Sequence, residues 1–107
     1  MDRRGEAVTE KKTFTYEEAS ALLPEVQRIT VEAVAEARAL PSDATEEGRR
    51  VLTQWIEDIL ALGLEVKGLW LVDFDCGVGY YCWQHPEASL QFFHGYEEGF
   101  GGRVPMV

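Results

Sequence analysis

Residues 69–105 read LWLVDFDCGVGYYCWQHPEASLQFFHGYEEGFGGRVP, and this stretch decides the class of fold. It holds nine of the twelve aromatic side chains, both cysteines and both histidines. Because aromatic side chains bury the most apolar surface, most of the core must form around it. Residues typical of strands fall in three short runs separated by turn residues, Leu69–Phe74, Tyr80–Gln84 and Leu90–His94. We therefore expect three antiparallel strands in sequence order, followed by an irregular glycine-rich tail from Gly95.

A long helix is predicted before this stretch. Thr15 and Glu18 form the S/T-x-x-E capping box, so the helix begins at about Tyr16. Apolar residues then recur at steps of three and four as far as Leu40, which is the spacing of one helix face. Pro24 lies within this pattern, and a proline there removes a backbone hydrogen bond. We expect a kink at that residue.

A second helix is predicted after the break at Pro41. Ser42 or Asp43 is the expected N-cap, because short polar side chains accept hydrogen bonds from the first helical amides. Gly63 follows the last periodic residue and suits a left-handed C-cap. The short connection predicts that the two helices pack as an antiparallel hairpin.

Together these elements predict an α+β fold, with the helical hairpin packed on a three-stranded antiparallel meander. Residues 1–13 are expected to be a flexible tail, and residues 14–107 a single domain. The aromatic side chains outnumber what one face of a small sheet can hide. We therefore expect either the C-terminal tail or a second subunit to cover the other face.

Charge narrows the class of partner. The net charge is −9, and from Thr13 onward six basic residues stand against sixteen acidic ones. Nucleic acid and anionic membranes are not expected as partners, because both attract basic proteins. No apolar stretch approaches the length of a membrane span or a signal peptide, so the expected location is the cytoplasm.

The two cysteines, Cys76 and Cys82, flank the expected first hairpin turn. A cross-strand disulfide is one interpretation of this placement. We favour the other interpretation, in which both thiols are reduced and one of them packs in the core, because disulfides are rare in the cytosol.

Five segments in the same order resemble a known family. They are FTYEEASALLPEV at Phe14–Val26, LGLEVK at Leu62–Lys67, LVDF at Leu71–Phe74, YCW at Tyr81–Trp83 and HGYEEGFGGRVP at His94–Pro105. The chain is similar in these segments to a bacterial family of small proteins, the domain-of-unknown-function family twenty-two-zero-three. The resemblance implies a free-standing bacterial domain and no particular activity. The chain departs from the family pattern in two places. It has Asp75 where a proline is expected after LVDF, and the connection between its helices is short.

The candidate site is a group of polar residues near the ends of the first and third strands. These strands run in the same direction in a meander, so Asp73 and His94 are expected at one edge of the sheet. With Glu97 they offer the ligands of a divalent metal or the groups of acid–base catalysis. The alternative is a structural network in which Asp73 pairs with Arg103 and His94 bonds to the backbone. The candidate residues are Asp73, His94, Glu97, Glu98 and Arg103, with Asp73, His94 and Glu97 as candidate metal ligands.

Three functions remain open. No complete catalytic motif and a surplus of aromatic side chains favour a non-catalytic protein-interaction module that forms a homodimer or binds another protein. A small metal-assisted or acid–base enzyme using Asp73, His94 and Glu97 is the first alternative. A small-ligand binder that uses the aromatic strands is the second. No cofactor is predicted, apart from the divalent metal of the enzyme hypothesis.

Overall fold

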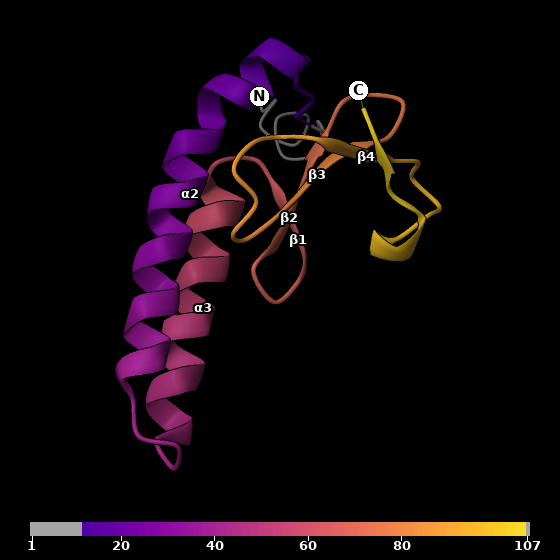
Figure 1. Cartoon of the computed structure of the whole chain (residues 1–107). Coiled ribbons are helices and arrows are strands. Elements are labelled where there is room, and N and C mark those ends of the chain that lie inside the picture. The colour runs from indigo at the N-terminus through magenta and orange to yellow at the C-terminus, as the bar shows by residue number, and fades with distance from the viewer. Residues whose placement is uncertain (1–11, 107) are drawn as a thin grey trace, which may run out of the picture.

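The computed structural model describes residues 12–106, and it shows two helices followed by an antiparallel sheet (Figure 1). Helix α2 spans Tyr16–Ala39 and helix α3 spans Thr45–Ala61. They lie side by side as an antiparallel hairpin, with the sheet against one side of it. The fold is α+β, as the sequence predicts. The predicted flexible tail lies outside the described residues except for Lys12 and Thr13.

The start of α2 follows the predicted capping box. Glu18 N donates to Thr15 Oγ1 at 3.1 Å, and Thr15 N donates to Glu18 Oε1 at 2.9 Å. Helix α2 continues through Pro24 as one element, so the expected kink is not confirmed. The predicted cap of α3 is wrong, because the N-cap is Ala44, which makes no side-chain cap, and Asp43 contributes only its backbone carbonyl to Thr45 N.

The sheet has five strands rather than the predicted three. They are β1 Glu65–Gly68, β2 Leu71–Asp75, β3 Tyr80–Gln84, β4 Phe92–His94 and β5 Val104–Pro105, and they pair in sequence order. The first was predicted as a connector, because EVKG has few residues typical of strands. The last lies in the predicted irregular tail. Strands β1 and β5 are both held by hydrogen bonding to a neighbouring strand. The strand propensity of their own residues does not predict that pairing.

The helices cover the inner face of the sheet. Val72, Phe74 and Trp83 point into this core, where each is at most 1 % exposed. Trp55 of α3 packs edge-on against Trp70, with ring centroids 4.8 Å apart. Trp70 has a φ of 58° in the two-residue turn between β1 and β2. A positive φ is rare for a bulky residue, and packing against Trp55 holds it there.

The outer face of the sheet is covered by the chain itself. Residues 95–103 fold over it on the side away from the helices (Figure 1). Tyr96 donates its hydroxyl to Asp75 Oδ1 at 2.7 Å and packs edge-on against Tyr80. The Arg103 guanidinium lies over the rings of Phe92 and Phe100, at 3.9 and 4.1 Å from their centroids. Of the two covers expected from the sequence, the C-terminal tail or a second subunit, the glycine-rich tail is the one that covers this face.

Neither helix in the described part of the chain has the length and apolar character that crossing a membrane requires.

Candidate functional site

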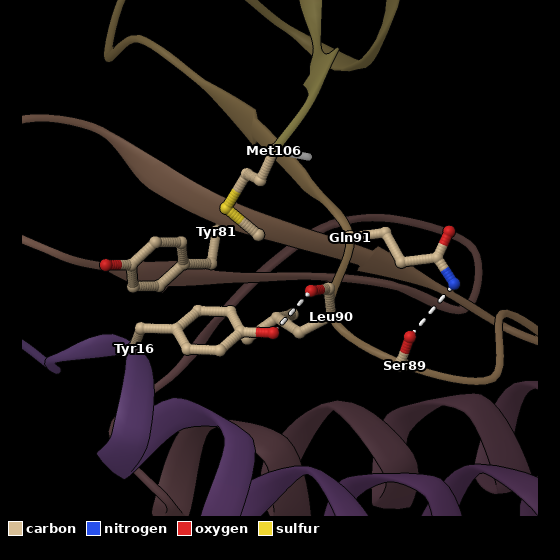
Figure 2. Close-up of a pocket in the computed structure, with 6 residues that line it drawn as sticks. All are labelled: Tyr16, Tyr81, Ser89, Leu90, Gln91 and Met106. Atoms are coloured by element: carbon tan, nitrogen blue, oxygen red, sulfur yellow. Dashed lines mark hydrogen bonds between the residues drawn. The ribbon is translucent and has the colours of Figure 1, made fainter.

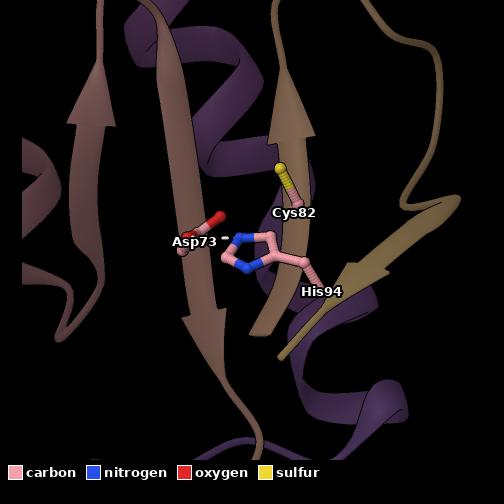
Figure 3. Close-up of side chains that lie close together, drawn as sticks. All are labelled: Asp73, Cys82 and His94. Atoms are coloured by element: carbon pink, nitrogen blue, oxygen red, sulfur yellow. Dashed lines mark hydrogen bonds and ion pairs between the residues drawn. The ribbon is translucent and has the colours of Figure 1, made fainter. Parts of the chain in front are cut away.

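Three buried side chains from three neighbouring strands meet on the outer face of the sheet. Asp73 of β2, Cys82 of β3 and His94 of β4 point toward one another (Figure 3), and one ligand atom of each lies within 4.8 Å of the other two. Asp73 and Cys82 are direct partners in the β2–β3 register. Because Cys82 is small, Asp73 and His94 can meet across β3. The sequence places Asp73 and His94 together correctly, and it misses Cys82 as their neighbour.

The hydrogen bonds of His94 place a proton between it and Asp73. Its Nδ1 lies 2.8 Å from the carbonyl oxygen of Gly95, which only accepts, so Nδ1 carries a hydrogen. Its Nε2 lies 2.8 Å from Asp73 Oδ2. Either the ring is an imidazolium or Asp73 is protonated, because two lone pairs would otherwise face each other. Both ring nitrogens are therefore occupied, and neither is free to act as a base on a bound substrate.

The ammonium group of Lys67 also reaches Asp73. Lys67 Nζ lies 3.2 Å from Asp73 Oδ2 and 3.5 Å from Glu65 Oε1. The ammonium also lies over the Tyr80 ring, at 3.9 Å from its centroid. Burial lowers the pKa of Lys67, but the charge of Asp73 and its hydrogen bond outweigh it, so the net effect raises that pKa. The Lys67 side chain is about one-third exposed.

The remaining carboxylate oxygen of Asp73 has no donor in hydrogen-bonding geometry among residues 12–106, whereas the Cys82 thiol interacts with both Asp73 and Arg103. Asp73 Oδ1 is fully buried and accepts no hydrogen bond from the described residues. Burial raises the pKa of Cys82 to about 12, and the negative charge of Asp73 acts in the same direction. The thiol is therefore protonated in this form of the protein. A buried carboxylate oxygen without a donor is costly, and such groups in native proteins often mark a site that holds something else.

Arg103 lies beside this group with a different partner from the expected one. It pairs with Glu87, through Nη2 to Oε2 at 2.5 Å and Nη1 to Oε1 at 3.2 Å, and not with Asp73. Its Nη1 also lies 3.9 Å from Cys82 Sγ. The expected backbone bond of His94 is present at Gly95 O. Both cysteines are free thiols, so the disulfide interpretation is wrong.

A cleft of about 310 Å³ opens above the Asp73–His94 pair. Asp73 and His94, at 0 and 3 % exposure, form its floor. Glu97 and Glu98 are exposed on its wall. Glu98 Oε1 accepts from Gly95 N at 2.9 Å, which braces the turn after β4. The other lining residues are Lys67, Leu71, Tyr96, Gly99 and Phe100.

A second cleft, of about 540 Å³, lies where the start of α2 meets the sheet (Figure 2). Tyr16 donates its hydroxyl to the Leu90 carbonyl at 3.1 Å and packs edge-on against Tyr81. The other lining residues are Ser89, Gln91 and Met106, and no lining side chain is an acid, a histidine or a cysteine. Larger size does not make it the better site, because its polar side chains can orient a ligand but none is an acid or base that could activate one.

Sequence reasoning missed Lys67, Cys82 and Glu87 as members of this site. One signal was present for Cys82. A four-residue turn at Cys76–Gly79 pairs Asp75 with Tyr80, and counting back from that pair sets Asp73 opposite Cys82. No comparable signal marks Lys67, because its strand was not predicted, or Glu87, which approaches Arg103 only through the folded tail.

The fold and site together define a small α+β domain, with a helical hairpin on one face of its sheet and a buried polar cluster on the other. Residues 41–106 match the family described as "Uncharacterized conserved protein (DUF2203)". Because the match covers more than half of the chain, the chain belongs to that family. It is the family whose motifs the sequence resembles, although the Phe14–Val26 segment precedes the matched range. No curated protein and no solved structure matches the chain.

Proposed function

We propose that this protein is a small-ligand-binding domain, and that its ligand lies in the cleft above Asp73 and His94. The observation that carries the proposal is a cleft of about 310 Å³ whose floor is a buried, proton-linked pair of ionisable side chains. That size is at the lower end of the range for small-molecule sites. Buried ionisable pairs at the floor of a cleft are concentrated at functional sites.

The lining favours a ligand with a positively charged head and a short apolar part. Glu97 makes no hydrogen bond or ion pair with the described residues, so its carboxylate can receive a cation. Lys67 does not offset this charge, because Asp73 and Glu65 already pair with it. Leu71 and Phe100 offer apolar contact beside it. A small primary amine has this chemistry.

Binding is better supported than acid–base catalysis. Both ring nitrogens of His94 are occupied, and Asp73 Oδ1 is buried below the surface of the cleft. A general base must reach the proton that it removes, and neither group does so in this form. The domain is proposed to hold its ligand and present it, with no reaction at the Asp73–His94 pair.

The test is calorimetric titration with a panel of small primary amines and their carboxylic acid counterparts. We expect amines to bind and matched acids not to bind. Glu97→Gln should weaken amine binding about tenfold or more, since a charged hydrogen bond contributes roughly 1.5–3 kcal/mol. Glu57→Gln, on an exposed position of α3, is the control and should bind as the natural protein does. Amine binding that Glu97→Gln leaves unchanged would contradict the proposal.

A protein-interaction function is supported by a different observation, the exposed apolar side chains. Leu69, Val78 and Val104 are 60, 76 and 53 % exposed. The aromatic surplus that first suggested a homodimer has a different explanation, because the segment after His94 covers the outer face. We therefore rank self-association second. Light scattering at micromolar concentration distinguishes a dimer from a 12.1 kDa monomer.

A further inference from the structure

We propose that Asp73, Cys82 and His94 form a binding site for one divalent cation of the zinc type. The proposal goes beyond ligand binding in the cleft, because it shares Asp73 and His94 with the cleft and adds Cys82, which does not line it. It also differs from the metal site expected from the sequence, in which Glu97 was the third ligand. Glu97 lies on the wall of the cleft and is not one of the three converging residues.

The geometry of the three side chains suits such an ion. In a tetrahedral zinc site, bonds of about 2.0–2.3 Å place neighbouring ligand atoms about 3.4–3.7 Å apart. One ligand atom of each residue already lies within 4.8 Å of the other two, and all three residues are at most 3 % exposed. The ligands come from three adjacent paired strands, so the sheet fixes their relative positions. Coordination requires the side chains to shift within the 4.8 Å that now holds their ligand atoms, with His94 Nε2 and Asp73 Oδ2 moving apart from their 2.8 Å hydrogen bond.

The hydrogen bonding around the three residues suits a cation held at their centre. Asp73 Oδ1 is buried and accepts no hydrogen bond from the described residues. Among residues 12–106, Asp73 Oδ2 contacts the proton shared with His94 Nε2 and the ammonium of Lys67. His94 Nδ1 bonds to the Gly95 carbonyl, the outer contact that orients a metal-binding histidine and leaves Nε2 to coordinate. The shared proton and the Lys67 ammonium therefore provide the positive charge that a bound metal ion would provide.

The charges of the site also balance when a divalent metal ion replaces its protons. The Cys82 thiol loses its proton, and its sulfur lone pair forms the bond to the metal. The proton between His94 and Asp73 leaves as well. The thiolate and the carboxylate then neutralise a divalent ion, and Lys67 can turn to Glu65, whose Oε1 is already 3.5 Å away. Arg103, 3.9 Å from Sγ, stabilises the thiolate form.

The donor set selects the class of metal. One sulfur, one imidazole nitrogen and one carboxylate oxygen suit Zn²⁺, with Co²⁺ as its spectroscopic substitute. Mg²⁺ and Ca²⁺ prefer oxygen ligands alone, so they should not compete. Three protein ligands leave a fourth position. The cleft adjoins Asp73 and His94, so that position would be filled from the cleft by water or a ligand.

The test is titration of the metal-free protein with Co²⁺, followed by displacement with Zn²⁺. We expect one equivalent to produce a thiolate-to-cobalt charge-transfer absorption and the visible bands of a four-coordinate ion. Cys82→Ser should abolish the charge-transfer band and weaken Zn²⁺ binding by about 100-fold or more, at least the loss seen for outer contacts of metal ligands. Cys76→Ser is the matched control, because it removes the other cysteine and should leave the band intact.

Two further measurements keep the test independent of folding and of the cleft. X-ray absorption of the zinc-loaded natural protein should show one sulfur at about 2.3 Å and lighter ligands at about 2.0–2.1 Å. Glu97→Gln should weaken amine binding and keep the cobalt band, which separates the two proposals. No charge-transfer band at equimolar Co²⁺, a band that survives Cys82→Ser, or a zinc shell without sulfur would overturn the inference.

Discussion

The indole Nε1–H of Trp55 donates a hydrogen bond to Thr30 Oγ1 at 2.9 Å across the helical hairpin. Trp55 is 1 % exposed and Thr30 is fully buried. Trp55 also contacts Trp70 in the turn between β1 and β2. This bond therefore ties α2 to α3 at the point where the hairpin meets the sheet, and it sets the position of the core tryptophan.

Removing the hydroxyl of Thr30 should destabilise the fold. Thr30→Val keeps the shape of the side chain but leaves the Trp55 N–H buried without an acceptor, which costs about 1–3 kcal/mol. Urea denaturation followed by tryptophan fluorescence measures this loss. The control is Thr53→Val on an exposed position of α3, which should change stability by less than about 0.5 kcal/mol. Equal stability of Thr30→Val and the natural protein would contradict the prediction.

Two glycine substitutions should act in opposite directions. A Cβ at Gly79 would lie 2.5 Å from Phe93 Cζ and 2.7 Å from the His94 carbonyl oxygen, so Gly79→Ala should destabilise by about 1–3 kcal/mol. A Cβ at Gly48 would meet no heavy atom within 4 Å, and the residue is helical. Gly48→Ala should stabilise by about 0.4–1 kcal/mol. Thermal unfolding of both variants checks the signs. A Gly79→Ala variant as stable as the natural protein would show that the turn is not crowded, and a destabilised Gly48→Ala would contradict the second prediction.

Replacing Arg103 by lysine should loosen the segment that covers the outer face. Lysine cannot form the two parallel bonds to Glu87 or stack flat between Phe92 and Phe100. We expect a loss of about 1–2 kcal/mol, at the low end for charged hydrogen bonds, because the pair keeps 14 and 20 % exposure.

Hydrogen exchange measures the effect of Arg103→Lys directly. Amides of residues 95–105 should exchange faster, while those of the helices should keep their rates. Arg49→Lys provides a comparison, because its pair with Glu46 lies on the exposed surface of α3. If exchange in residues 95–105 stays as slow as in the natural protein, the Arg103–Glu87 pair does not hold the segment down.

The ion pair of Glu25 and Arg28 predicts a specific pH dependence. The hydrogen bond from Arg28 lowers the pKa of Glu25 below 4.5, and the two groups lie 2.6 Å apart on α2. For a carboxyl with a lowered pKa, the stabilisation is present above its unfolded value and is lost as pH falls through the folded one. Carbon-detected NMR titration should show the pKa of Glu25 rising toward that of an unpaired glutamate in Arg28→Gln. The same titration of Arg38→Gln should leave it unchanged.

The two cysteines should differ in reactivity. Cys82 is fully buried, and burial raises its pKa to about 12, whereas Cys76 is partly exposed. The thiolate is the reactive form, so iodoacetamide at pH 8 should modify Cys76 and leave Cys82 intact in the native state. Mass spectrometry of the digested protein identifies the modified residue. Equal labelling of both residues would show that the outer face opens readily.

Local sequence signals located some parts of this structure and missed others for identifiable reasons. The capping box at Thr15 and Glu18 places the start of α2 correctly, because both partners lie within one helical turn. The strand Tyr80–Gln84 was predicted at its observed bounds. Strands β1 and β5 were missed, because each is short and is held by a neighbouring strand rather than by its own residues. Ala44 at the start of α3 shows the limit of capping rules, since it caps without a side-chain bond.

By itself, the sequence determined the α+β class, the order of helices and strands, and the meeting of Asp73 with His94. These follow from periodicity and chain direction, which are local properties. The length of the Cys76–Gly79 turn also sets Cys82 opposite Asp73. Only the tertiary structure decided that Lys67 reaches Asp73 and that Arg103 pairs with Glu87. Those contacts depend on strand register and on residues 95–103 folding over the outer face. Both are set by packing between segments far apart in the chain, which no local pattern encodes.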